Sequence, residues 1–205
     1  MQTKRRTRDC VHSAQGMAAK TFSAVAAFAL VASLVFAPFP SAAQLVDENE
    51  LVEAIRDGDV ADVEEAFLAG LNANERSIKG VPALIEAVRT GKRSIVELLL
   101  DRGARVNIPG RRDGVTALEE AARIDRPDIA QILIDAGADV DKTGKQGQTP
   151  LMVAATLGHT AIVQVLIDAD AYLNDTDSTG RTPLTLAEER RHKQTVELLR
   201  SAGAE

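Results

Sequence analysis

The residues in this sequence that are best suited to catalysis or metal binding are two histidines, His159 and His192. An imidazole ring can serve as a general base or as a metal ligand. Neither histidine comes with a nucleophile motif: Cys10 is the only cysteine, and no Gly-x-Ser-x-Gly segment occurs. The two histidines are 33 residues apart, and this interval recurs along the chain. We therefore interpret both as occupying one structural position of a repeat.

An acidic loop, Asp175–Gly180, begins like a calcium-binding loop. It has oxygen-bearing side chains at its first, third and fifth positions and a glycine at its sixth. Such a loop needs a bidentate glutamate at position twelve, where this chain has Leu186. A polar turn is the favoured interpretation. With no phosphate-binding glycine loop either, the sequence predicts no catalytic residues, no cofactor and no metal, and we expect no enzyme.

The interval between the histidines extends over most of the chain. Three independent series of landmarks share it, and no step in the leucine and alanine series departs from it by more than one position. Three series with one period indicate a tandem array of structural repeats. They are Leu51, Leu84, Leu118, Leu151 and Leu184; Ala54, Ala87, Ala121, Ala154 and Ala187; and Gly70, Gly103, Gly137 and Gly203, with Asp170 in the place of the missing glycine.

The best-preserved segments of the array resemble the ankyrin repeat. They are Thr149-Pro-Leu151, Ala154-Ala155, Gly158-His159, and the Gly137-Ala-Asp-Val140 ending. The resemblance covers about residues 44–205. It implies an all-α ankyrin-repeat solenoid of about five helix-turn-helix repeats, at about 45–77, 78–110, 111–144, 145–177 and 178–205. The first repeat is the weakest match, and its polar character suits a terminal cap.

The array departs from the family in one motif. The family's Thr-Pro-Leu-His segment lacks its histidine in every repeat, where Ile85, Glu119, Met152 and Thr185 stand instead.

Local patterns predict where the helices begin and how they stack. In repeat two we expect helices over 82–90 and 94–102, the second ended by a left-handed Gly103. In repeat three we expect Asp125 as the N-cap of a helix that has Pro127 in its first turn. One extra residue falls in the loop 108–113. Alanines on the first helices and larger aliphatic residues on the second predict a curved stack, with first helices and loops on its concave face.

The charge of the chain is divided unevenly. Residues 1–43 hold five basic residues and one acidic residue, which leaves 19 basic and 29 acidic residues, a net charge of −10, for residues 44–205. Binding to nucleic acid depends on basic residues that neutralise phosphates. The acidic array therefore argues against a nucleic-acid partner.

The first 43 residues have the three parts of a secretory signal peptide. A basic segment precedes the uncharged 16-residue run Phe22–Ala37, and Ser41-Ala42-Ala43 supplies small residues for cleavage near Ala43. Translation from Met17 would also produce a complete signal. The alternative is an uncleaved anchor, although the run is shorter than the ~20 residues that span a bilayer. Either reading places the repeats outside the cytoplasm, periplasmic or secreted, with membrane contact only through an uncleaved signal.

These observations predict a monomeric protein-binding module without catalysis. By resemblance to the family, the variable positions that contact a partner are loop tips and the ends of first helices. The alternative from another class is a periplasmic inhibitor or immunity-type protein that blocks one enzyme or toxin. The predicted partner-binding residues are Arg89, Thr90, Arg111, Arg112, Arg123, Ile124, Lys142, Lys145, Thr156 and Leu157.

Overall fold

The structure is a computed structural model that describes residues 50–205, apart from the side chain of Lys145. The predicted signal segment, residues 1–43, lies outside the described residues. Within residues 50–205 the regular elements are helices, which confirms the predicted all-α class. They are α1 (Glu50–Asp57), α2 (Val60–Leu68), α3 (Ala83–Thr90), α4 (Arg93–Asp101), α5 (Ala117–Arg123), α6 (Pro127–Asp135), the short 3-10 turn η2 (Lys145–Gly147), α7 (Pro150–Leu157), α8 (Thr160–Asp168), α9 (Pro183–Glu189) and α10 (Lys193–Ser201).

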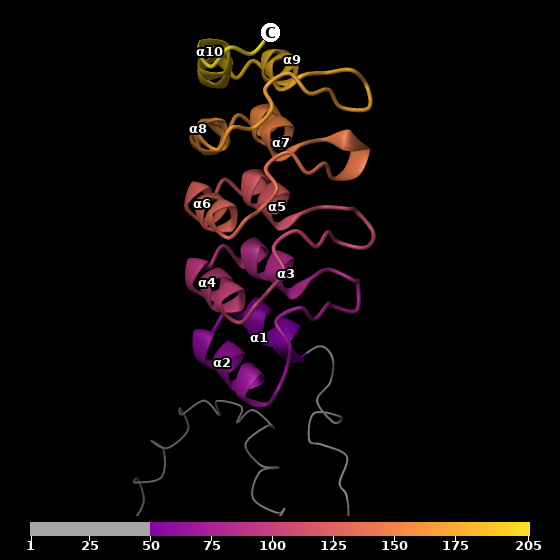
Figure 1. The fold of residues 1–205 in the computed structure, drawn as a ribbon, viewed down its shortest axis with the longest axis vertical. Helices are drawn as coiled ribbons and strands as arrows, with labels where there is room; N and C mark the ends of the chain where they lie inside the picture. The colour runs from indigo at the N-terminus through magenta and orange to yellow at the C-terminus, as the bar shows by residue number, and fades with distance from the viewer. Residues whose placement is uncertain (1–49) are drawn as a thin grey trace, which may run out of the picture. The chain divides into compact units, whose positions relative to one another are not determined.

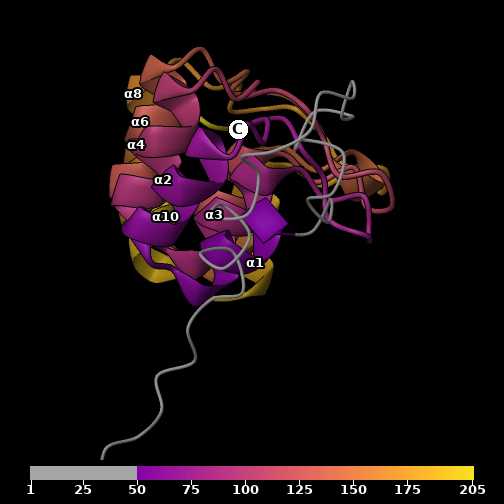
Figure 2. The ribbon, with the colours of Figure 1, turned by 90° about the horizontal axis from the view of Figure 1, so that it is seen from below.

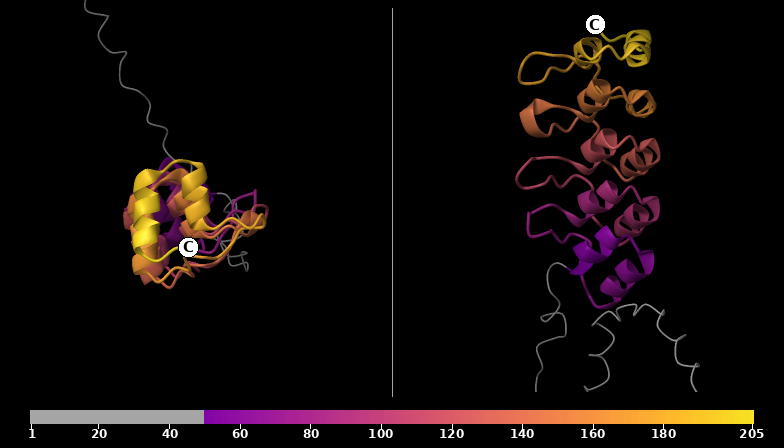
Figure 3. Two further views of the ribbon diagram at one scale, coloured as in Figure 1. Left: turned by 90° about the horizontal axis from the view of Figure 1, so that it is seen from above. Right: turned by 180° about the vertical axis from the view of Figure 1, so that it is seen from behind.

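The ten α-helices of this region form five pairs stacked one upon another (Figure 1). The first helices of the pairs form one layer and the second helices form another (Figures 1 and 2). The connections between pairs project beyond the first helices, away from the second (Figure 3). We call these connections fingers 1 to 4, residues 69–82, 102–116, 136–149 and 169–182. Finger 2 is one residue longer than the others, as the insertion in 108–113 predicts.

Threonines and prolines start the first helices. Thr116, Thr149 and Thr182 are the N-caps of α5, α7 and α9, and each hydroxyl accepts a hydrogen bond from the amide three residues on, at 3.1–3.3 Å. This bond satisfies an amide that has no partner inside the helix. Pro150 and Pro183 follow the caps directly, where a missing N–H costs nothing.

The predicted N-cap of α6 was wrong. Its N-cap is Arg126, and Asp125 adopts a left-handed conformation with φ +54°. Arg126 occupies the repeat position at which His159 and His192 are the N-caps of α8 and α10, where no proline follows, so the repeat and not Pro127 sets the cap. The tight turn then falls on Asp125, because aspartate is one of the few residues other than glycine that tolerate this conformation. Asp170, in the place of a repeat glycine, is left-handed for the same reason (φ +60°).

The core is aliphatic and lies between neighbouring helix pairs. Ala87, Ala121, Ala154 and Ala187 are fully buried on the first helices, and leucines such as Leu99 fill the second layer. The first helices approach one another more closely than the second helices do. The small alanine side chains account for this close approach, because they keep neighbouring backbones from being held apart. The curvature expected from it stays a prediction.

Asparagine and aspartate side chains connect the fingers of successive repeats. The side chain of Asn107 accepts a hydrogen bond from the amide of Asp139 at 2.9 Å and donates one to the carbonyl of Gly137 at 2.9 Å. Asn74 makes the same pair of bonds one repeat earlier. Asp141, next in the series, accepts from the amide of Tyr172 at 2.8 Å but has no proton to donate.

The two histidines are part of a second periodic connection, which links each pair to the one before. His192 and His159 are the N-caps of α10 and α8. Nε2 of His192 hydrogen-bonds to the carbonyl of Thr156 at 3.0 Å, and Nδ1 of His159 lies 3.7 Å from the carboxylate of Asp125. At the same position Lys92 donates to the carbonyl of Gly58 at 2.6 Å. His192 therefore holds two repeats together, and His159 occupies the matching position of the repeat before, as their spacing indicates.

The position of the His192 ring predicts that substitution of Gly158 destabilises the fold. Gly158 ends α7 with φ +77°, and a Cβ there would lie 2.5 Å from Nδ1 of His192. Gly137 has a similar φ of +84° with nothing within 4 Å of its Cβ position. Gly137→Ala should therefore cost about 1 kcal/mol of folding free energy from backbone strain alone. Gly158→Ala should cost about 2–3 kcal/mol, because the His192 ring must also move.

Urea unfolding of both variants, compared at equal m values, measures the difference. Equal losses would show that the His192 ring does not constrain the turn between α7 and α8.

Candidate functional site

Arginines and glutamates recur at matched positions of the first three repeats. Arg56, Arg89 and Arg123 stand at the ends of the first helices, one repeat apart from one another. Glu86 and Glu120 lie three positions before the second and third of them. Residues three apart on a helix share one face. The repeat period therefore aligns these charges in one row along the stack. We call the surface formed by the ends of the first helices, on which this row lies, the inner face.

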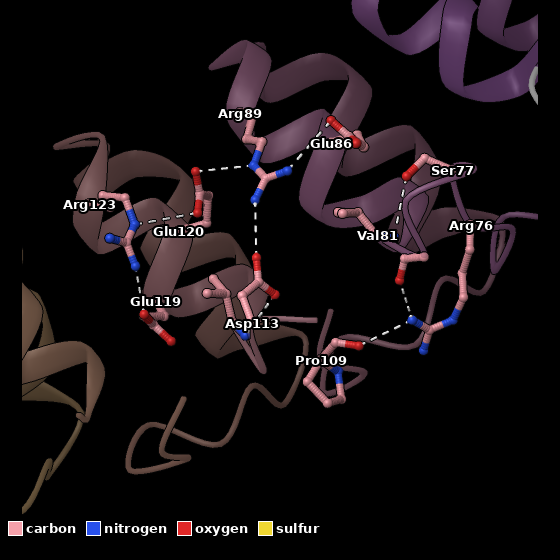
Figure 4. A network of polar contacts seen from close by, with 12 residues as sticks. Arg76, Ser77, Val81, Glu86, Arg89, Pro109, Asp113, Glu119, Glu120 and Arg123 are labelled. Carbon is pink, nitrogen blue, oxygen red and sulfur yellow. Dashed lines mark hydrogen bonds and ion pairs between the residues drawn. The ribbon is translucent and has the colours of Figure 1, made fainter. Parts of the chain in front are cut away.

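On the inner face, arginine side chains alternate with carboxylates (Figure 4). The carboxylate of Glu86 accepts a hydrogen bond from Nη2 of Arg56 at 2.9 Å and lies 3.8 Å from Nη1 of Arg89. The carboxylate of Glu120 accepts a hydrogen bond from Nε of Arg89 at 3.2 Å and lies 3.5 Å from Nε of Arg123. Each of these carboxylates is thus paired with the arginine of its own repeat and with that of the repeat before. Arg89 also lies 3.9 Å from Asp113 of finger 2.

The two sides of these ion pairs differ in burial. The side chains of Glu86 and Glu120 are 7% and 9% exposed, whereas Arg89 is 34% exposed. A buried carboxylate is tolerated only when it is paired and hydrogen-bonded. The arginines therefore have a structural role, and they also present part of each guanidinium to solvent in a fixed orientation.

Glu119 occupies the place of the missing motif histidine in repeat three. Its Oε1 accepts a hydrogen bond from Nη2 of Arg123 at 2.6 Å, and its side chain is only 3% exposed. Burial raises the pKa of this carboxyl, against the effect of Arg123, and the nearby Glu120 and Asp113 raise it further. Its other oxygen, Oε2, has no hydrogen-bond partner among the described residues.

Glu119 lines a pocket of about 400 Å³ on the inner face. The pocket lies between α5 and fingers 2 and 3, close to the end of α3. Its polar lining is Arg89, Asp113, Glu119, Glu120, Arg123, Gln146 and Gln148.

The predicted partner-binding residues at the helix ends fall into three groups. Arg89 and Arg123 belong to the ion-pair row just described. The hydroxyls of Thr90 and Thr156 donate to carbonyls of their own helices, Ala87 and Met152, both at 2.7 Å. The two apolar residues, Ile124 and Leu157, differ from each other. Ile124 is partly buried against the core, and Leu157 is 43% exposed.

The predicted partner-binding residues in the fingers are more exposed to solvent. Arg111 and Arg112 are exposed in finger 2, and the side chain of Arg111 lies against Gly80 of finger 1. Lys142 in finger 3 is half-buried. The side chain of Lys145 lies outside the described residues. Arg76 connects fingers 1 and 2, because it donates to the carbonyl of Gly80 at 2.7 Å and to that of Pro109 at 3.2 Å (Figure 4).

Sequence reasoning identified two of the three inner-face arginines, Arg89 and Arg123, but missed Arg56 and the carboxylate partners. Glu86 and Glu120 recur one repeat apart, three positions before Arg89 and Arg123. Because both the glutamates and the arginines recur at the repeat interval, the sequence indicated a row of ion pairs. The pocket had no such signal, because its lining comes from two fingers and two helices.

The acidic loop of finger 4 is a polar turn around Asp177, as its sequence favours. The buried carboxylate of Asp177 accepts hydrogen bonds from the amide and hydroxyl of Thr179, at 2.8 and 2.6 Å. It also pairs with Nη2 of Arg181 at 2.9 Å. These bonds hold the pKa of Asp177 well below its usual range. The carboxylate is therefore fully engaged within its own turn.

Stacked helix pairs with projecting fingers and a charged inner face define a helical repeat protein. The family model described as "Ankyrin repeats (3 copies)" matches residues 51–144 and 126–205, so the chain belongs to the ankyrin repeat family. Ankyrin repeats are in general protein–protein interaction modules and are typically non-catalytic. The comparison with curated proteins gave no match. None of the helices within residues 50–205 has the length and apolar character needed to cross a membrane.

The shared position of Arg89 predicts a loss of stability when it is removed. Arg89→Ala leaves Glu86 and Glu120, both more than nine-tenths buried, with one cation fewer. We expect a loss of about 1–3 kcal/mol, less than for a fully buried pair because Arg89 is partly exposed to solvent. Arg93→Ala is the matched control, since the Arg93–Glu97 pair is exposed on both sides and should change stability by at most about 0.5 kcal/mol.

Chemical unfolding monitored by circular dichroism measures both variants. A loss for Arg89→Ala no larger than that for Arg93→Ala would contradict the structural role of the row.

Proposed function

We propose that this chain is a non-catalytic binding module that is exported from the cytoplasm and holds a partner protein against its inner face and fingers. Family membership supports the general activity. Two features of this chain support the proposed surface and location: its ordered arginines and its N-terminal segment.

The observation that carries the proposal is the fixed orientation of exposed arginines. Arg89 contacts three carboxylates and Arg123 contacts two, yet both keep a third or more of their side chains open to solvent. A side chain that is already ordered loses less conformational entropy when a partner binds. Arginine is also enriched among residues that dominate binding energies. Leu157, exposed at the end of the next first helix, adds an apolar contact to this surface.

The N-terminal segment supports export. Its basic start, uncharged run and small residues at 41–43 are the parts of a cleavable signal. With the signal removed, the repeats carry a net charge of −10 and no cysteine. An array without thiols needs no particular redox environment, so it suits an oxidising compartment as well as a reducing one.

The binding surface is tested by a double variant, Arg112→Ala with Leu157→Ala. Both side chains are exposed, and Arg112 makes no ion pair within residues 50–205. Their loss should weaken partner binding at least tenfold, about 1.4 kcal/mol. Stability should change by no more than about 0.5 kcal/mol. The matched control is Arg93→Ala with Leu68→Ala, an exposed arginine and an exposed leucine of the second-helix layer.

The partner is first captured by cross-linking the mature chain in an extracytoplasmic fraction and is identified by mass spectrometry. Its affinity for each variant is then measured by calorimetry. Unchanged affinity of the Arg112→Ala/Leu157→Ala variant, or an equal loss of affinity in the control variant, would remove this surface from the proposal.

Export is tested by the mass of the mature chain in a Gram-negative host. We expect a periplasmic protein whose mass corresponds to cleavage near Ala43. Leu30→Arg places a charge in the apolar run and should retain the full-length chain in the cytoplasm. Ser13→Arg, in the segment that is already basic, should be processed normally. Full-length protein in the membrane fraction would favour the anchored alternative, and cytoplasmic wild-type protein would refute export.

A further inference from the structure

We propose that the tips of fingers 1 and 2 bind an acidic segment of the partner protein, one that carries an apolar residue among its carboxylates. The inference rests on the proposed binding function, and it specifies the chemistry of the partner. Three observations support it: the positive charge of these two fingers, the bonds that join their tips, and an exposed isoleucine beside the cations.

Fingers 1 and 2 are basic although the repeat array is acidic. Together they contain six basic and two acidic residues, a net charge of +4, whereas residues 44–205 as a whole have a net charge of −10. Fingers 3 and 4 have net charges of 0 and −2. The five second helices, which lie on the other side of the first helices (Figure 3), have a combined net charge of −6. Positive charge is therefore concentrated in two neighbouring fingers.

The acidic residues of these two fingers are held by other groups. Glu75 accepts a hydrogen bond from the amide of Asn72 at 3.1 Å. Asp113 accepts one from the amide of Val115 at 3.3 Å and lies 3.9 Å from Nη2 of Arg89. The ion pairs within residues 50–205 include none of the six basic residues of the two fingers, which are Arg76, Lys79, Arg102, Arg105, Arg111 and Arg112. Their positive charge is therefore not neutralised within this part of the chain.

The tips of the two fingers are joined, which gathers three of these cations at one surface. The amide of Arg111 donates to the carbonyl of Gly80 at 3.3 Å, and Cδ of Arg111 would lie 3.0 Å from a Cβ at Gly80. The side chain of Arg76 joins the same carbonyl to finger 2 (Figure 4). Lys79 precedes Gly80, Arg112 follows Arg111, and all three cations are exposed. We call the surface formed by Ile78, Lys79, Arg111 and Arg112 the basic tip.

An exposed apolar residue lies beside the cations. Ile78 is 86% exposed and precedes Lys79 in a turn that the amide of Gly80 closes by donating to the carbonyl of Ser77 at 2.7 Å. Burial of an isoleucine against an apolar side chain contributes to affinity independently of charge. The basic tip therefore suits a segment in which carboxylates surround one apolar residue.

The distribution of charge directs such a segment to the basic tip. Like charges gathered at one surface repel one another, and carboxylates of a partner would relieve that repulsion. The negative charge of the second-helix layer repels an acidic partner from the rest of the array. Opposite charges across an interface also steer the encounter and fix its orientation.

An acidic protein segment fits this surface better than an anionic membrane does. Anionic lipids attract basic side chains near the membrane surface. They would also repel the net charge of −10 that the repeat region carries. The general activity of the family, binding to other proteins, favours the protein segment as well.

The first test titrates the mature chain with the peptide N-acetyl-Glu-Glu-Leu-Glu-Glu-amide. Nitrogen-15 NMR of the backbone amides should show saturable shifts confined to fingers 1 and 2, with a Kd on the order of 0.1 mM. Raising the salt concentration from about 0.02 to about 0.2 M should weaken binding several-fold, because salt screens exposed charges. A peptide with glutamine in place of glutamate should cause no shifts, and one with serine in place of leucine should bind several-fold more weakly.

A pair of matched variants separates the basic tip from a general charge effect. Ile78→Ser with Lys79→Gln should weaken the acidic peptide at least about fivefold. Leu68→Ser with Lys193→Gln removes one exposed apolar residue and one exposed cation elsewhere, and should leave affinity unchanged. Both variants should unfold at the wild-type urea concentration, because all four side chains are exposed. Equal affinity of the two variants for the peptide would overturn the proposal.

The membrane is tested with vesicles of phosphatidylglycerol, to which we expect no binding at about 0.15 M salt. Vesicle binding that is lost in the Ile78→Ser/Lys79→Gln variant, without binding of the acidic peptide, would assign the basic tip to a lipid surface and overturn the proposal.

The captured partner gives a direct readout of the contact. A carbodiimide joins an amine to a carboxylate only where the two touch, so it should couple Nζ of Lys79 to an aspartate or glutamate of the partner. Mass spectrometry identifies the coupled peptide, which should contain several acidic residues and an apolar one. Lys79→Gln should abolish this product, and Lys193→Gln should not.

Failure of this proposal can be told from failure of the proposed function. The peptide titration needs no partner, so it reports on the basic tip alone. A captured partner that loses affinity for the Arg112→Ala/Leu157→Ala variant but not for Ile78→Ser/Lys79→Gln would retain the binding function and reject the acidic segment. Peptide binding without any captured partner would refute the proposed function, and with it the contact between the basic tip and a partner protein.

Discussion

The structure depends above all on the burial of each helix pair against its neighbours. One pair of such short helices cannot enclose a core alone, so the apolar side chains of a repeat are buried only by the next repeat. Ala87, Ala121 and Ala154 are fully buried at the contacts between first helices. Their small size sets how closely the backbones approach. Larger residues such as Leu99 fill the second layer, so the two layers of one repeat are spaced differently.

Close stacking creates a demand for polar partners, because the ends of the helices and the turns are brought together with their carbonyls and amides unpaired. The side chains of Asn74 and Asn107 meet that demand in the fingers, and Lys92 and His192 meet it at the turns between helices. These bonds join atoms about one repeat apart in sequence. They also explain why residues that seemed suited to chemistry, the two histidines in particular, have a structural role.

The inner face follows from the same stacking. In the third repeat Glu120 is paired with arginines of two repeats, whereas the corresponding residues of repeats four and five, Val153 and Leu186, are buried and apolar. The stack therefore has a charged part and an apolar part, which meet near the pocket of Glu119. A partner that spans this junction would meet ordered arginines and an exposed Leu157. Such a combination can specify a partner although the scaffold itself is common to many functions.

The sequence by itself determined the repeat period, the helical class and the extra residue of finger 2. Each of these depends on residues that are neighbours in the chain or that recur at one interval. Asp125 shows where such reasoning fails, because the N-cap of α6 is Arg126, at the repeat position that His159 and His192 occupy in α8 and α10. Only the tertiary structure decided which charges pair. Glu120 meets Arg89 of the repeat before, and Gly144 of the next finger covers Glu119. The energy of a buried charge depends on the atoms that surround it, and in a stacked array those atoms belong to another repeat.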